Sequence, residues 1–389
     1  MKFAHTGDLH IGKRLHERSL LEDQRIVLWQ ILDILCKEEV EVLVVSGDIY
    51  DKPTPGVDAV KLFDEFVYEL ERKNIKLIAI SGNHDSMERI SFGSRIMSKK
   101  GIFFQENFSG EAQKIVLSDS YGEINFYMIP FIKPAYVGSD SYEEAFAKIV
   151  ASSNIDFSKR NILVAHQFFT GTKPGMDLNN DMLKESGLLP ERTESEAINV
   201  GGLDNISYEL VRDFDYVALG HLHKSQCVGE DYIRYSGSPL KYSFSESNHD
   251  KSIVIVDVKS KGDISINKIS LEMPRDLRVI KGKLENLVSK DVVEAEGVSR
   301  EDYICAVITD KERVTDAANK LLRWYPNLLK IEYEYENVAG LSKDLPNIKG
   351  KSPMQLFEEY YEMINGRTMD SQEMSIVAKL LGGDKDETN

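Results

Sequence analysis

Seven side chains with oxygen or nitrogen donors follow directly after short apolar runs of the sequence. These donors are Asp8, His10, Asp48, Asn83, His166, His221 and His223. Carboxylates, imidazoles and one amide, with no thiolate, suit borderline divalent cations such as Mn²⁺, Fe²⁺ or Zn²⁺. Seven donors exceed the four of one structural zinc site, so two ions are the expected number. Two cations about 3.5–4 Å apart activate a shared water for displacement at phosphorus.

Each of these motifs alone is weak support for such a site. An Asp-x-His pair arises often by chance, and a lone buried histidine such as His166 is more often a hydrogen-bonded core residue. The set is more informative, because five of the eight histidines fall in these endings, at positions 10, 84, 166, 221 and 223. An accidental set of this kind is rare, which favours a metal site.

To form one site, the donors must lie at the ends of strands that meet at the same place. Five short apolar runs in the sequence are candidates for these strands. The runs cover residues 3–6, 40–45, 75–80, 162–165 and 216–219. Their near-continuous apolar character predicts strands covered on both faces. Amphipathic patterns over 20–39 and 57–73 predict helices between the first three strands, which indicates a layered α/β fold. Ligands bind beyond the carboxyl ends of strands in such sheets, where all five polar endings fall.

The remaining chain predicts shorter elements. Strand patterns occupy 124–129 and 232–235, and a hairpin is expected from 252–258 and 264–269. Residues 167–202 have few periodic features and are expected to form a long surface loop. Residues 273–276 look like a linker. Beyond it, strand patterns at 303–309 and 329–335 flank a helical pattern at 314–325, which predicts a small α/β unit.

Two helices are expected after a break at residues 340–351. Ser352, Pro353 and Gln355 supply an N-cap, a first-turn proline and a capping-box partner. Asp370 and Glu373 form a looser version of the same box. We therefore expect three parts, at 1–272, 273–345 and 346–389.

The composition is that of a globular protein with 389 residues, of which 42% are hydrophobic and 29% charged. This excludes a disordered chain, a collagen and a disulfide miniprotein. The net charge of −16 argues mildly against a nucleic-acid binder. Bound dications or a local basic loop can still invert the field at a site.

The three cysteines, Cys36, Cys227 and Cys305, lie far apart and form no C-x-x-C pair. They therefore indicate reduced thiols rather than a disulfide framework. The sequence shows no signal peptide and no stretch of roughly 18 apolar residues that could span a membrane. A cytoplasmic location is expected, with no membrane partner.

The order Asp-x-His, Gly-Asp, Gly-Asn-His-Asp, His and Gly-His-x-His resembles that of the calcineurin-like metallophosphoesterases. The resemblance implies that Asp48 bridges two divalent metals. One metal would take Asp8, His10, Asp48 and His223, and the other Asp48, Asn83, His166 and His221. It also implies that His84 is the general acid for the leaving oxygen and that Asp85 orients it. The alternative is that His84 only caps a turn.

Longer strings, at 5–12, 47–51, 81–86, 218–223 and 233–239, are similar to those of the SbcD family of bacterial nuclease subunits. This resemblance covers essentially the whole chain and is strongest up to about residue 258. It implies a calcineurin-like domain with a small α/β capping domain and a C-terminal helix pair. It further implies a Mn²⁺-dependent nuclease of DNA repair and recombination, acting on double-stranded ends, single strands and hairpins. The role of Asp51 stays open, because relatives outside the bacterial branch carry histidine there.

The resemblance also implies a homodimer and a partner, an SbcC-type SMC-like ATPase that docks on the C-terminal helices. Simple packing of those helices on their own protein is the alternative. The sequence itself contains no G-x-x-x-x-G-K-[ST] string, so any use of ATP must come from a partner chain.

A short basic loop directly follows Asp8 and His10. Its residues Lys13, Arg14, His16 and Arg18 are candidate DNA phosphate contacts. An ordinary solvated loop is an equally good interpretation. The adjacent aromatic residues Phe168 and Phe169 could stack on an unpaired base, but the pattern favours core packing.

Two other functions are compatible with these motifs. A small-molecule or cyclic-nucleotide phosphodiesterase would use the same metal ligands, but it would not need the capping domain or the terminal helices. A phosphoesterase fold that serves only as a scaffold would have lost its ligands, whereas this chain keeps the full set.

Overall fold

The computed structural model describes residues 1–171, 189–193, 205–294, 299–310, 314–334, 352–365 and 367–382. The chain divides into two compact units. The first comprises Met1–Ile308 and Val314–Glu332, and the second comprises Thr309–Arg313 and Tyr333–Asn389. Among the described residues, no helix is both long and apolar enough to cross a membrane.

Two six-stranded sheets form the main body of the first unit. The first sheet has the order β16 (Ile264–Ser270), β15 (Ser252–Val258), β1 (Lys2–Thr6), β4 (Val42–Val45), β5 (Lys76–Ala79) and β6 (Ile102–Phe104). The second has the order β13 (Gln226–Val228), β14 (Glu230–Tyr235), β12 (Tyr216–Gly220), β9 (Arg160–His166), β8 (Gly122–Ile129) and β7 (Gln113–Asp119). In the first sheet β1, β4, β5 and β6 run parallel, as do β14, β12, β9 and β8 in the second. Antiparallel strands complete one edge of the first sheet, with β15 and β16, and both edges of the second, with β13 and β7.

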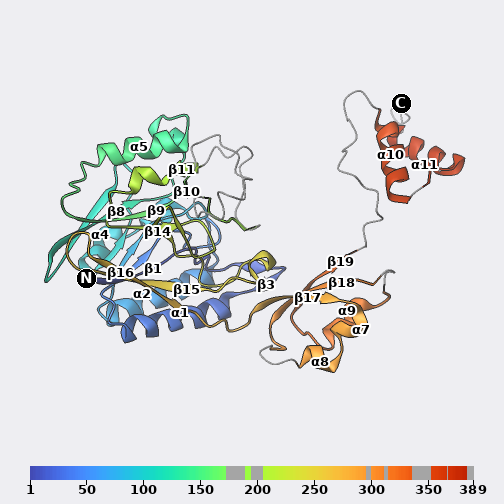
Figure 1. The fold of residues 1–389 in the computed structure, drawn as a ribbon, viewed down its shortest axis with the longest axis horizontal. Coiled ribbons are helices and arrows are strands. Elements are labelled where there is room, and N and C mark those ends of the chain that lie inside the picture. The colour runs from blue at the N-terminus through green and yellow to red at the C-terminus, as the bar shows by residue number, and fades with distance from the viewer. Residues whose placement is uncertain are drawn as a thin grey trace. The chain divides into compact units, whose positions relative to one another are not determined.

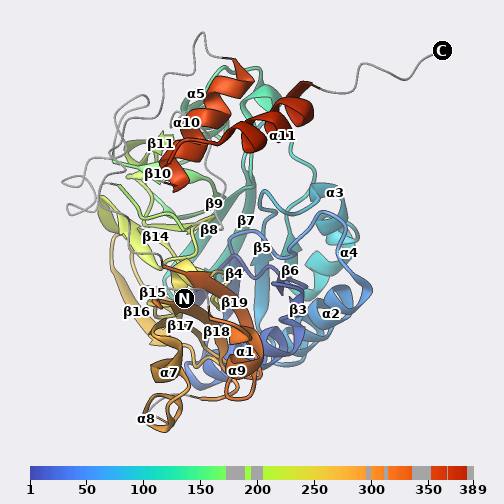
Figure 2. The ribbon, with the colours of Figure 1, turned by 90° about the vertical axis from the view of Figure 1, so that its right-hand side faces the viewer.

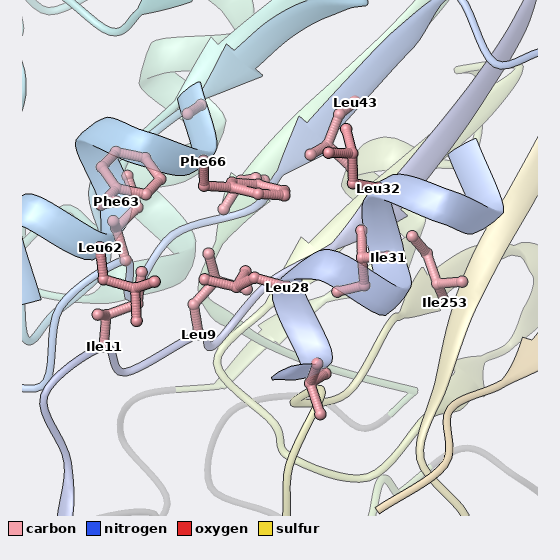
Figure 3. Close-up of a cluster of buried hydrophobic side chains, with 14 of the residues drawn as sticks. Leu9, Ile11, Leu28, Ile31, Leu32, Leu43, Leu62, Phe63, Phe66 and Ile253 are labelled. Atoms are coloured by element: carbon pink, nitrogen blue, oxygen red, sulfur yellow. The ribbon is translucent and has the colours of Figure 1, made fainter. Parts of the chain in front are cut away.

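The inner faces of the two sheets pack against each other. The Phe3 ring from β1 meets the edges of Phe126 and Tyr216 from the second sheet, with ring centroids 5.6 and 5.5 Å apart. Helices α1 (Leu21–Lys37) and α2 (Val57–Arg72) cover the outer face of the first sheet (Figure 1). Figure 3 shows Leu28, Ile31 and Phe66 from these helices packed with Leu43 and Ile253. Helix α5 (Tyr142–Ser152) packs on the outer face of the second sheet.

The predicted strands and the two long helices are therefore confirmed, with ends shifted by a few residues. Both predicted helices end close to their expected positions, and the strands are buried on both faces as expected. After β5 the chain forms the short helices α3 (Met87–Ile90) and α4 (Ser94–Met97), which lead to β6 (Figure 2). The sequence did not indicate that the donor-bearing strands divide between two sheets.

The prediction of a surface loop over residues 167–202 is wrong for its first residues, which form a strand. Residues Phe168–Thr170 form β10, which pairs in parallel with β11 (Asn205–Ser207). Phe168 and Phe169 are buried in the core, so the packing interpretation of these rings is confirmed. Residues 172–188 and 194–204 lie outside the described residues, as does the predicted break at 340–351.

A three-stranded sheet follows the predicted linker. It has the order β17 (Leu277–Gly282), β18 (Tyr303–Ile308) and β19 (Leu328–Tyr333), with the short helices α7 (Leu284–Leu287), α8 (Lys290–Val293) and α9 (Ala317–Leu322). The helix expected over 314–325 is shorter than predicted, because Asp316 adopts a left-handed backbone conformation and residue 326 is a proline. The buried Asp23 of α1 accepts hydrogen bonds from Arg275 and Tyr303, at 2.8 Å each, and so connects α1 to this sheet.

The second unit contains helices α10 (Pro353–Asn365) and α11 (Ser371–Gly382). Both predicted capping boxes are present. The Ser352 hydroxyl accepts from the Gln355 backbone N–H at 3.2 Å, and the Gln355 side chain accepts from the Ser352 N–H at 2.9 Å. Asp370 and Glu373 exchange the same pair of bonds at 2.9 Å each. The division into the three predicted parts remains a prediction.

Arg160, at the start of β9, fastens the two sheets together at the end away from the predicted ligands. Its guanidinium donates to the Asp119 carboxylate, at 2.7 and 3.0 Å, and to the carbonyls of Gly122, Glu123, Val258 and Lys259. Val258 belongs to the first sheet and Asp119 to the second. Arg160 is 4% exposed, so its charge depends on these partners.

Replacing this guanidinium tests its contribution to stability. Arg160→Met should lower the free energy of unfolding by about 3–5 kcal/mol, because it leaves the Asp119 carboxylate with fewer partners in a poorly solvated place. Urea denaturation followed by circular dichroism measures the change. Arg212→Met removes an exposed pair with Glu209 and should cost less than about 1 kcal/mol. Equal losses in the two variants would contradict the proposed role of Arg160.

Candidate metal centre

The carboxyl ends of five strands, three from one sheet and two from the other, bring all seven predicted donors together. β1, β4 and β5 of the first sheet precede Asp8, His10, Asp48 and Asn83. β9 ends in His166, and β12 precedes His221 and His223 in the second sheet. The backbone N–H of His221 donates to the Asp8 carboxylate at 2.9 Å, which ties the two groups of loops together.

The backbone at four of the donors is strained. Asp8, His10, Asp48 and His221 have φ values of 52°, 43°, 50° and 107°, a region that side chains rarely adopt. Such conformations persist only where the surroundings enforce them, and they concentrate at functional sites. Here they turn the side chains inward immediately after each strand.

One group of donors surrounds His10. Its Nε2 atom lies 3.1 Å from Nε2 of His223 and 3.6 Å from the Asp48 carboxylate. Donor atoms of Asp8, His10 and His223 all lie within 4.8 Å of one another. The Nδ1 atom of His10 is buried and makes no hydrogen bond within the described part of the chain.

A second group of donors surrounds Asn83. Its Oδ1 atom lies 3.0 Å from Nε2 of His166 and 3.1 Å from Nδ1 of His221. Nε2 of His166 is 3.4 Å from the Asp48 carboxylate. Asp48 therefore belongs to both groups.

These separations fit metal coordination. Adjacent ligands of an octahedral ion, each about 2.1 Å from the metal, lie about 3 Å apart. The contacts within the two groups, at 3.0–3.6 Å, are close to that spacing. The spacing within each group is therefore suitable for a divalent cation, and the Asp48 carboxylate is common to both groups.

The charges at the site also suit cations. Burial lowers the pKa of His10 and of His221 well below the usual range, so both rings are neutral and keep a lone pair. Burial raises the pKa of Asp8 to about 7. Burial opposes ionisation of Asp48 as well, but the neighbouring His166 outweighs it and holds the pKa of Asp48 far below its usual range. A divalent cation would relieve the cost of burying these carboxylates together.

Two histidines are oriented by partners that the sequence motifs did not identify. Nδ1 of His166 donates to the Ser46 carbonyl at 2.7 Å, so Nε2 is the ring atom that faces Asn83 and Asp48. Nδ1 of His223 faces the Glu246 carboxylate at 3.1 Å. Glu246 is fully buried and pairs with Lys251 at 2.6 Å. A carboxylate that orients a metal-binding histidine is a recurring arrangement in metal sites.

Asp85 is predicted to orient the His84 ring, but its carboxylate bonds backbone groups instead. The Asp85 carboxylate accepts backbone N–H groups of Ile49, Tyr50 and Gly82 at 2.9–3.0 Å, and so joins the loops after β4 and β5. The His84 ring is held instead by the Asp51 carbonyl, 3.0 Å from its Nδ1. Because a carbonyl can only accept, Nδ1 carries the proton, and Nε2 is the atom available for proton transfer. Asp51 thus acts on the His84 ring through its backbone.

Two glycines make room for the donors. A Cβ atom at Gly82 would overlap the Asp48 carboxylate, and one at Gly47 would overlap the His166 ring. Gly47 also has a φ of 95°, where a side chain would be strained. Glycine is therefore needed at these two positions because a larger residue would collide with Asp48 or His166, and not only because of the turns.

The predicted basic loop is a small hairpin, β2 (Arg14–Leu15) and β3 (Arg18–Ser19). Its two turn residues, His16 and Glu17, both have positive φ, as in a type I′ turn. Lys13 pairs with the Asp51 carboxylate at 2.8 Å, beside His10. Arg14 contacts Glu17, Arg18 approaches the Pro326 carbonyl at 3.5 Å, and His16 packs near Phe244. Lys13 is thus next to the donors, whereas the charges of Arg14 and Arg18 lie on the hairpin.

Comparison with known proteins assigns this fold and site to a family. The description "Calcineurin-like phosphoesterase" matches residues 1–225, more than half of the chain, and the protein belongs to this family. A second description, "Type 5 capsule protein repressor C-terminal domain", matches residues 273–365. The predicted α/β fold class of calcineurin-like type is confirmed.

Relatives whose names identify them as the SbcD component of the nuclease SbcCD match over nearly the full length. Those from Staphylococcus epidermidis and Staphylococcus saprophyticus are each 28% identical over 393 residues, which covers 98% of both chains. The resemblance to the SbcD family is thereby confirmed. A solved dimetal phosphatase from Danio rerio has a TM-score of 0.38 at 11% identity, covering 70% of this chain and 99% of that one.

The Glu246 contact can be tested by metal binding. Glu246→Gln should weaken Mn²⁺ affinity by about 10- to 100-fold, because the His223 ring loses the carboxylate that orients it. Isothermal titration calorimetry measures the affinity, and near-ultraviolet circular dichroism checks that the variant is folded. Glu123→Gln, at an exposed pair with Lys159, is the control and should bind as the unaltered protein does. An affinity within twofold of the control would refute the role of Glu246.

Proposed function

We propose that the protein is a metal-dependent DNA nuclease that hydrolyses phosphodiesters at a centre of two divalent ions, most suitably Mn²⁺. Its substrates would be double-stranded ends, single strands and hairpins, in repair and recombination. The observation that carries this proposal is the pair of donor groups sharing Asp48, in a chain related over its full length to SbcD nuclease subunits.

The residues have distinct proposed roles. Asp8, His10, Asp48 and His223 hold one ion, and Asp48, Asn83, His166 and His221 hold the other. When bound, the ions lower the pKa of a water and polarise a phosphate oxygen. His84 is placed to give a proton from Nε2 to the leaving oxygen, since its ring lies edge-on to His10 with centroids 4.8 Å apart. The backbone N–H of His84 also donates to Asp48 at 2.8 Å, which fixes the ring near the centre.

DNA binding by this acidic chain would depend on local charges and on the ions. Lys13, Arg14, His16 and Arg18 remain candidates for phosphate contacts. The geometry favours Lys13, because its ammonium lies beside Asp51 and His10, whereas the other three are on the hairpin. A phosphate would have to compete with Asp51 for Lys13.

Helices α10 and α11 are the proposed docking element for an SbcC-type ATPase. They cluster as a unit separate from the phosphoesterase body. They also expose large apolar side chains, namely Phe357, Tyr360, Met374 and Ile376. Exposed apolar residues along two capped helices are what a partner helix or coiled coil would cover.

A small-molecule or cyclic-nucleotide phosphodiesterase remains the second candidate. It would use the same two groups of donors. The additional three-stranded sheet and the terminal helices favour the nuclease, since a small substrate needs neither.

Mn²⁺-dependent cutting of an end-labelled DNA hairpin tests the nuclease directly. His84→Ala should slow cleavage by about 10²- to 10⁴-fold, because it removes the proposed proton donor without removing a metal ligand. EDTA should abolish cleavage. Tyr68→Ala, at a side chain of α2 that is 60% exposed, is the control outside the donor groups and should cut at the normal rate. Hydrolysis of bis(p-nitrophenyl) phosphate with no DNA cleavage would favour the small-molecule phosphodiesterase instead.

A homodimer is also proposed, and exposed apolar residues between α3 and β6 suggest where to test it. Phe92, just before α4, and Ile96, within α4, are 83% and 76% exposed. Phe92→Glu combined with Ile96→Glu should convert a dimer to a monomer, because charges would be buried in the contact. Light scattering coupled to size-exclusion chromatography measures the mass. A dimer that survives both changes places the contact elsewhere.

A further inference from the structure

A cavity of about 510 Å³ opens directly beside the candidate metal centre. One wall is the loop after β5, including Asn83, and another is the start of α3. Phe131, Lys133 and Tyr136, the last from the 3₁₀ turn η2 (Pro134–Val137), also line it. The cavity and the donor groups therefore share Asn83, and anything in the cavity would be next to the ions.

Phe131 connects the cavity to the donors. Its ring lies 6.4 Å from that of His221 at an angle of 23°, and 6.3 Å from that of His166 at 80°. Its backbone N–H donates to the Ser81 carbonyl at 3.0 Å, which fixes it to the strand end that carries Asn83. The Phe131 ring therefore lines the cavity and also lies close to two of the donor rings.

The other lining groups suit a flat, partly polar ligand. Tyr136 and Phe108 supply further aromatic surface, and Met87 adds a polarisable thioether. Tyr136 is 59% exposed, so its face is accessible at the mouth. Cavities of roughly 300–1,000 Å³ with apolar walls and a few polar groups are typical ligand sites.

The charges favour a base over a second phosphate. Glu88 lines the cavity and accepts from the Ser86 hydroxyl at 2.8 Å, so a carboxylate faces the space. A carboxylate repels phosphate but accepts hydrogen bonds from base amino groups. Lys133 stands on the other wall, and no ion pair among the described residues uses it. Lys133 could therefore meet the backbone phosphate of a nucleotide whose base is inside.

We propose that this cavity holds one unpaired base of the strand being cut, on the nucleotide next to the phosphodiester at the metal centre. The inference rests on the proposed nuclease function and adds a specificity site to it. A paired, stacked base cannot enter such a cavity, because it would first have to leave the duplex. Cutting would therefore be fastest where the strand is single, looped or frayed.

A scan of abasic sites tests this proposal. Single strands with one abasic nucleotide at successive positions are cut with Mn²⁺, and rates are measured at substrate concentrations below saturation. The unaltered protein should lose about 5- to 150-fold in rate at one position beside the cut, the effect of losing one stacked base. Tyr136→Ala should lose a similar factor on the intact strand and show no further loss at that position.

Tyr121→Ala is the matched control, because Tyr121 is 56% exposed and lies in the turn between β7 and β8. It should reproduce the scan of the unaltered protein. A scan with no sensitive position, or one equally sensitive in Tyr136→Ala, would overturn the base cavity while leaving the nuclease intact. A failure of the unaltered protein to cut any strand would overturn the nuclease proposal, and this inference with it.

Discussion

Two buried carboxylates, Asp8 and Asp48, impose the constraint on which the rest of the domain depends. Both are almost fully excluded from water, and burial disfavours the ionised form of each. Such a pair persists only where opposite charges or donors converge on it. The imidazoles, the Asn83 amide and the backbone N–H groups of His84 and His221 provide that environment. The surrounding groups lower the cost of burying the two carboxylates, and the same oxygen and nitrogen atoms are suitable ligands for cations.

The scaffold meets this constraint by bringing two sheets together at their carboxyl ends. The inner faces pack through Phe3, Phe126 and Tyr216, and the Arg160 guanidinium fastens the opposite end. β9 runs from Arg160 at the fastened end to His166 at the centre. A shift of one sheet against the other would separate the His10 and His223 rings, so the core packing sets the spacing of the donors.

The donors could be predicted from the sequence because polar residues that end apolar strands stand out against their neighbours. The partition of those strands between two sheets could not, since periodicity does not tell which strands pair. Glu246 lies in a short 3₁₀ turn, η4 (Phe244–Glu246), and reaches His223 only through tertiary packing. The position of Asp85 in the motif predicts that it orients the His84 ring. In the structure its carboxylate instead accepts hydrogen bonds from backbone N–H groups of the neighbouring loops. Strand β10 was missed because three residues are too few to show a pattern.

The position of β15 has a consequence for when the donor site can form during synthesis of the chain. β1, which carries the first donors, is enclosed in its sheet only when β15 pairs with its free edge. The orienting carboxylate of Glu246 lies just ahead of β15 in the chain. All seven donors and Glu246 precede β15, which ends at Val258. A chain that is still being synthesised can therefore complete the site only after roughly the first two-thirds of the sequence has left the ribosome.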